Sequence, residues 1–199
     1  MNKNRKLTKE INNWIFSILG ACLIAVLINS KVFATVIVEQ SSMENTLYSG
    51  QKLILDKLSY NFVDPKRKDI IIFLENEERG TIIDDAVTFI NNINAKAENN
   101  VVDKRLVKRV IGIPGDKINI KDGFVYINGE KLNESYAKGQ TFTGVINFPL
   151  DVPNDKLFVL GDNRTVSKDS REFGLIKYNQ VEGKVAFRFS PLKKIGIIK

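Results

Sequence analysis

The sequence predicts a mainly β domain that follows an N-terminal transmembrane helix and contains one inserted amphipathic helix. Three observations support this fold class: short β-branched runs between turn residues from position 51 onward, an apolar stretch near the N-terminus, and one segment with apolar residues at helical spacing. At 199 residues and 43% hydrophobic content, the chain can bury one moderate core. We therefore expect a single domain with one appendage.

The predicted strands are β-branched runs that alternate with turn residues. Lys121-Asp122-Gly123 lies between two of them and predicts a hairpin turn, and Asn128-Gly129 predicts a second turn directly afterwards. The predicted strands are 52–56, 69–74, 106–113, 117–120, 124–127, 156–160, 184–189 and 195–198.

One segment departs from the strand pattern and predicts an amphipathic helix over 84–97. Its apolar residues recur at helical spacing, and Asp84 is placed to cap the N-terminus. We expect this helix to lie within an insertion that covers about 75–104.

The apolar N-terminal stretch predicts a membrane anchor over 14–38. Residues 14–28 are almost entirely apolar, and the apolar character resumes after Lys31. A membrane-spanning helix needs about 20 residues, which this stretch supplies if Lys31 reaches toward an interface. The alternative is a cleaved secretory signal, for which the basic start, the apolar core and the small residue Ala34 are also suitable.

The charge distribution predicts the orientation of this anchor in the cell membrane. Basic residues in 1–13 favour a cytoplasmic N-terminus, so residues 39–199 are expected on the extracytoplasmic side. The net charge of +7 favours contact with anionic lipid headgroups, although a solvated basic surface explains it equally well. The basic residues outside the N-terminus are too diffuse to predict nucleic-acid binding.

The composition restricts the chemistry of the chain. There is no histidine, which excludes a histidine-based catalytic triad, and Cys22 is the only cysteine, which excludes an intrachain disulfide and a Cys-rich metal site. A serine nucleophile in this chain therefore needs a lysine amine or a carboxylate as its base. No metal or organic cofactor is predicted.

Four motifs occur in order along the chain: QSSMENTL at 40–47, RKDIIIF at 67–73, KRVIGIPGD at 108–116 and GDNRTVSKDSREFG at 161–174. Together they resemble the type I signal peptidases, most closely those of Gram-positive bacteria. These are membrane-anchored Ser/Lys endopeptidases that remove signal peptides from exported proteins. The resemblance spans nearly the whole chain and implies a signal-peptidase-like antiparallel β-sheet or barrel domain.

The resemblance implies a catalytic pair of Ser42 as nucleophile and Lys108 as general base. It also implies that the Ser167 hydroxyl orients the lysine amine. An exposed lysine has a pKa near about 10.4, so work at about pH 7–8 requires its pKa to fall by roughly 2–3 units. Burial achieves this, and the apolar neighbours of Lys108 are suited to it.

Four charged residues of the last motif are expected to support the loop rather than to react. They are Asp162, Arg164, Asp169 and Arg171, of which the last two resemble a structural ion pair of the family.

The first two motifs depart from the family pattern. The oxyanion donors are expected to be the backbone N–H of Ser42 and a group of Gln40, where the family often has Gly or Ser. Met43 is expected to line the substrate groove. Asn45 replaces a common proline, and Lys68 replaces a glycine, which implies either strain in a tight turn or a different turn.

The implied partners are signal-peptide-bearing precursor proteins and the lipid bilayer, and the sequence predicts no oligomeric state. Three alternative functions compete with this interpretation. A catalytically silent, membrane-tethered peptide-binding protein of the same fold is consistent with the departures at Gln40 and Asn45. A self-cleaving repressor would need a DNA-binding unit ahead of the catalytic region. A penicillin-recognising SxxK enzyme would need a lysine at 45.

Overall fold

The computed structural model describes residues 9–21, 32–75 and 105–198. The chain divides into two compact units, Met1–Phe33 with Gly80–Asn99, and Ala34–Arg79 with Asn100–Lys199. The second unit contains the β fold and the candidate site. The predicted helix over 84–97 lies outside the described residues.

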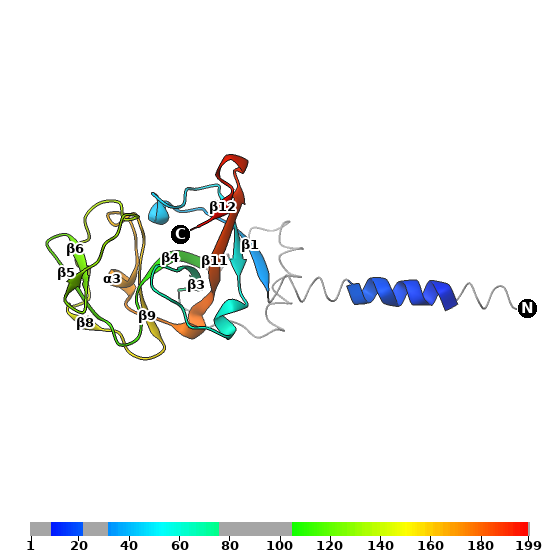
Figure 1. The fold of residues 1–199 in the computed structure, drawn as a ribbon, viewed down its shortest axis with the longest axis horizontal. Helices are drawn as coiled ribbons and strands as arrows, with labels where there is room; N and C mark the ends of the chain where they lie inside the picture. Colours follow the sequence, from blue (N-terminus) through cyan, green and yellow to red (C-terminus); the bar gives the residue numbers. More distant parts are fainter. Residues whose placement is uncertain (1–8, 22–31, 76–104, 199) are drawn as a thin grey trace, which may run out of the picture. The chain divides into compact units, whose positions relative to one another are not determined.

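In the first unit, residues 9–21 form a helix (Figure 1). Among the described residues, no helix has both the length and the hydropathy of a membrane span. The prediction of a span reaching residue 38 is wrong at its C-terminal end, because Phe33–Ile37 form strand β1. Ala34 and Val36 of this strand pack against the core, while the alternate positions are exposed, as in a half-buried strand.

The larger sheet of the second unit has the order β1-β2-β11-β3-β4-β9-β10, with β12 paired to β11. The pairs β2–β11, β11–β3, β3–β4 and β4–β9 are antiparallel. Its remaining strands are β2 (Lys52–Asp56), β3 (Ile70–Leu74), β4 (Arg105–Gly112), β9 (Lys156–Leu160), β10 (Ile176–Lys177), β11 (Val181–Ser190) and β12 (Gly196–Ile197).

The smaller sheet lies at the end of this unit away from β1 (Figure 1) and has the order β7-β6-β5-β8. Asp122 and Gly123 have φ values of 54° and 80°, and Asn128 and Gly129 have 53° and 89°. Consecutive left-handed residues are typical of tight hairpin turns, so both predicted turns are confirmed. The strands are β5 (Lys117–Lys121), β6 (Phe124–Ile127), β7 (Glu130–Lys131) and β8 (Leu150–Asp151).

Short helical turns connect the strands. The turn that carries Ser42 is a 3₁₀ turn between β1 and β2, and a short α-helix, α3, lies within the last motif. These elements are η1 (Ser41–Met43), η2 (Ser59–Asn61), α3 (Ser170–Phe173), η3 (Tyr178–Gln180) and η4 (Leu192–Lys194).

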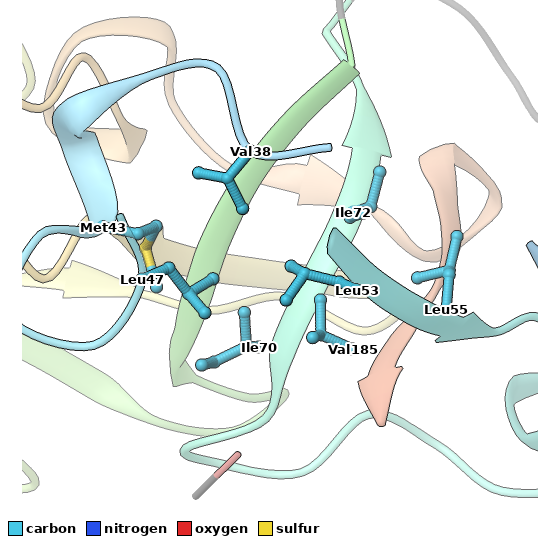
Figure 2. Close-up of a cluster of buried hydrophobic side chains, with 8 residues drawn as sticks. All are labelled: Val38, Met43, Leu47, Leu53, Leu55, Ile70, Ile72 and Val185. Carbon is cyan, nitrogen blue, oxygen red and sulfur yellow. The ribbon is translucent and has the colours of Figure 1, made fainter. Parts of the chain in front are cut away.

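The larger sheet is buried on both faces around β3. Ile70 and Ile72 belong to one apolar cluster, whereas Ile71 and Phe73 belong to another, as strand alternation requires. A third cluster packs the smaller sheet against β9. The first cluster includes Met43 of the turn that carries Ser42. It consists of Val38, Met43, Leu47, Leu53, Leu55, Ile70, Ile72 and Val185 (Figure 2).

The eight predicted strands are all present, with each boundary within three residues of its expected position. The mainly β antiparallel fold is therefore confirmed.

Candidate active site

Ser42 and Lys108 are in direct contact. Ser42 lies in η1 and is 8% exposed, and Lys108 lies in β4 and is 1% exposed. The Lys108 Nζ donates a hydrogen bond to the Ser42 Oγ at 2.8 Å. The fold thus brings together two residues that are 66 positions apart in the sequence.

Strand β4 holds the Lys108 amine in an apolar environment. Lys108 is the register partner of Ile71, so the two side chains share one face of the sheet, and Leu106 lies on that face as well. Burial lowers the pKa of Lys108 to about 8, while the carboxylates of Asp169 and Glu75 act in the opposite direction. A neutral amine is therefore accessible near neutral pH.

This geometry is suited to proton transfer. A heavy-atom distance of 2.8 Å lies within the hydrogen-bond range that general base catalysis requires. When Lys108 is neutral, its lone pair can accept the proton of the Ser42 hydroxyl and activate the oxygen as a nucleophile. The pair can therefore begin acyl transfer without histidine.

Asn163 holds the Ser42 turn from two directions. Its backbone N–H donates to the Ser42 carbonyl at 3.0 Å, and its side-chain Nδ2 donates to the Ser41 carbonyl at 3.2 Å and to Glu44 Oε2 at 3.3 Å. Glu44 also pairs with Lys138 at 2.9 Å. Asn163 is not among the site residues predicted from the sequence, although its place in the motif GDNR was the available signal.

Ser167 lies beside the same turn but does not bond the lysine. Ser167 is 5% exposed, and its Oγ has no hydrogen-bond partner in the described part of the chain. A Cβ on Gly161 would clash with both the Ser167 Oγ and the Ser42 carbonyl oxygen. Only glycine fits at 161, because these two groups approach its backbone closely.

A buried ion pair and its further contacts connect all four motifs. Arg109 donates to Asp162 through Nε at 2.9 Å and Nη2 at 2.7 Å, and the side chains are 1% and 0% exposed. Arg109 also donates to the Lys68 carbonyl and to Thr46, and its guanidinium lies 4.1 Å from the ring centroid of Tyr136. A bidentate ion pair of this kind fixes the loops around the site.

Asp169 and Arg171 form the ion pair that the family resemblance implied. Arg171 donates to Asp169 through Nε at 2.7 Å and Nη2 at 2.8 Å, and Asp169 also accepts the N–H of Gly161 at 3.0 Å. Asp169 caps α3 as well. Arg164 is equally buried and pairs with Glu134, so it supports the loop.

Two residues of the Ser42 segment differ in exposure. Gln40 is exposed and precedes η1 with extended backbone. Met43 is 1% exposed and packs with Val38 and Leu47 (Figure 2), so the prediction that it lines an open groove is wrong. Its apolar side chain is withdrawn into the core, where it holds the turn in place.

Two of the three departures from the family pattern, Asn45 and Lys68, adopt left-handed backbone. Asn45 has a φ of 94°, which proline cannot reach, and its Nδ2 donates to the Tyr136 carbonyl at 3.0 Å. Lys68 has a φ of 73°, the conformation that glycine adopts without cost. The turn at 68 therefore keeps a glycine-like shape with a lysine in it.

Two further features lie apart from the dyad. A cavity of about 430 Å³ is lined by Phe124, Lys131 and Gln140 among others, and neither Ser42 nor Lys108 lines it. In the part of the chain that the structure describes, no cluster of three or more His, Cys, Asp or Glu side chains is placed to hold a metal ion.

Comparison with known proteins identifies the family. The signal peptidase family, peptidase S26, matches residues 11–190. The signal peptidase I of Bacillus caldolyticus is 38% identical over 189 residues, covering 89% of this chain and 90% of the relative. Signal peptidase IB of Staphylococcus aureus strain COL is 33% identical and covers 94% of each chain.

A crystal structure of a signal peptidase I from Enterococcus faecalis V583 is also similar, with 32% identity and a TM-score of 0.43. The similarity covers 62% of this chain and 98% of that one. The family match and the curated relatives each extend over most of the sequence. The chain therefore belongs to the signal peptidase family, peptidase S26, and is a hydrolase that cuts peptide bonds.

Proposed function

We propose that this enzyme removes signal peptides from exported precursor proteins with Ser42 as nucleophile and Lys108 as general base. The observation that carries the proposal is the 2.8 Å contact between the two side chains in a buried, apolar setting. A desolvated amine is the kind of base that an unassisted serine needs.

The reaction proceeds in two stages. Neutral Lys108 takes the proton of the Ser42 hydroxyl while its Oγ attacks the scissile carbonyl carbon. The Lys108 ammonium then gives that proton to the leaving amine, which breaks the peptide bond and leaves an ester on Ser42. In the second stage a water molecule gives a proton to Lys108 and attacks the ester, and the proton returns to the Ser42 oxygen.

The backbone of Ser42 and two other residues are assigned supporting roles in this proposal. The Ser42 N–H and a group of Gln40 stabilise the oxyanion. Ser167 accepts a hydrogen bond from the Lys108 amine once substrate excludes water. Its buried hydroxyl without a partner among the described residues supports this role, because such a group gains most from a new bond.

We further propose that the chain is anchored in the cell membrane by its N-terminal segment, with the β domain outside the cytoplasm. The apolar stretch at 14–28 and the basic residues ahead of it support this orientation. Precursors tethered in the same bilayer would then meet the enzyme at a raised effective concentration.

The test is cleavage of a precursor that has a small residue before the cut, by the purified full chain in detergent. Ser42→Ala and Lys108→Ala should each abolish cleavage, whereas Ser49→Ala and Lys117→Ala, which alter exposed residues of the same types, should retain it. Precursor that is bound but never cut by the unaltered chain would instead support the silent peptide-binding protein.

A further inference from the structure

A solvent-exposed ion pair joins two segments that flank the Lys108 amine. Glu75 directly follows β3, and Lys168 directly follows Ser167. The Lys168 Nζ lies 2.7 Å from the Glu75 Oε1, with the two side chains 60% and 11% exposed. The pair therefore links the end of β3 to the segment that borders the Ser42 turn.

Glu75 is placed to act on the charge of Lys108. Ile71 is the register partner of Lys108, and strand alternation puts Phe73 on the same face, two positions before Glu75. The negative charge of Glu75 is one of two that raise the pKa of Lys108 against the effect of burial; the other belongs to Asp169. A carboxylate at this site favours the ammonium form, which cannot act as a base.

The partner of Glu75 is unusually open to solvent. Several carboxylates in and around the larger sheet are paired with a basic side chain. Burial differs greatly among these basic partners, and the Glu75 partner is the most exposed. The pairs, with the exposed fraction of the basic side chain, are Arg109–Asp162 (1%), Arg171–Asp169 (8%), Arg105–Glu182 (38%), Lys184–Asp69 (41%) and Lys168–Glu75 (60%).

We propose that the Glu75–Lys168 pair tunes the basicity of Lys108 and so sets the lower pH limit of peptide-bond cleavage. The inference rests on the proposed dyad. Glu75 stabilises the Lys108 ammonium, and Lys168 offsets that charge through a contact that solvent reaches. Neither residue touches the reacting atoms, so both act through Lys108.

The experiment measures kcat/KM from about pH 6 to about 10 for the full chain in detergent. The substrate is an N-acetylated signal-peptide substrate without groups that titrate in this range. Lys168→Met leaves Glu75 unpaired and should move the acidic limb to higher pH, by roughly half a unit. Glu75→Gln removes the charge and should move the limb to lower pH by a similar amount, with the high-pH plateau retained in both variants.

The double variant makes the test specific. Once Glu75 is replaced by Gln, adding Lys168→Met should raise the limb by less than it does in the unaltered chain, because the charge that Lys168 offsets is absent and only the direct effect of the Lys168 charge on Lys108 is left. Lys117→Met is the matched control, since it removes an exposed lysine charge from β5 of the smaller sheet, and it should leave the limb in place. Thermal unfolding of each variant separates these effects from loss of folding.

Two outcomes are informative in different ways. Profiles of Glu75→Gln and Lys168→Met that both overlie the profile of the unaltered chain would overturn the tuning role, while cleavage that depends on Ser42 and Lys108 leaves the dyad intact. Shifts in the same direction for both variants would also overturn it, because opposite charges must act in opposite senses on the Lys108 amine.

Discussion

Removing the Asp162 carboxylate by Asp162→Ala should lower the free energy of unfolding by about 3–5 kcal/mol. Arg109 is 0% exposed, and Asp162 accepts two of its hydrogen bonds, at 2.9 and 2.7 Å. The substitution leaves the guanidinium buried without a counter-charge, and its remaining acceptors are the Lys68 carbonyl and Thr46. The cost is therefore that of an unpaired buried charge rather than of one lost bond.

The double variant Arg109→Met with Asp162→Ala separates these two costs. It removes the charge as well as its partner, so it should be more stable than Asp162→Ala alone by roughly 1–3 kcal/mol. The free energies come from unfolding the full chain in urea and monitoring the transition by far-UV circular dichroism. Asp151→Ala in the exposed strand β8 should change them by less than about 0.5 kcal/mol. A double variant less stable than Asp162→Ala would refute the reasoning.

The remaining predictions concern the turn at 68 and the dyad. Lys68→Gly should raise the melting temperature by about 2–4 °C, because a left-handed lysine costs about 1 kcal/mol; a lower melting temperature would contradict the strain. Gly161→Ala should cut kcat/KM at least about 100-fold, since the added Cβ displaces Ser42 or Ser167; full activity would exclude the close packing. Ser167→Ala should reduce kcat by roughly 10–100-fold, and unchanged kcat would remove its orienting role. In the unaltered chain, kcat/KM should rise with pH to a plateau above about 8, as the Lys108 ammonium loses its proton; a limb near about 10 would mean a solvated amine.

The strands could be predicted where one face is apolar and the other polar. This holds for β5 and β6, whose alternation and left-handed turn residues are visible in the sequence. Strand β1 could not be told from the predicted membrane segment, because its exposed positions Phe33 and Ile37 are also apolar. The two-residue strands β7, β8 and β10 are too short to leave a pattern.

The motifs allowed the residues of the candidate site to be predicted, but not the contacts between them. The motifs indicated Ser42 and Lys108. Their contact, however, depends on the tertiary fold, because the two residues are 66 positions apart in the sequence. The role of Asn163 depends on how one turn packs on another, which residue type alone does not reveal. Met43 was misplaced because an apolar residue beside a nucleophile suits a groove and a core equally well.

The last residue of β3 pairs with the first residue of β4: Leu74 and Arg105 are register partners. A connection with such closely spaced ends can change length at little entropic cost, since doubling a loop costs only about 0.6 kcal/mol. The intervening stretch is thus a natural position for exchanging sequence or fusing a reporter, provided that Glu75 is kept. Relatives with a longer or shorter connection between these two ends would keep the same pairing of β3 with β4, which includes the pairing of Ile71 with Lys108.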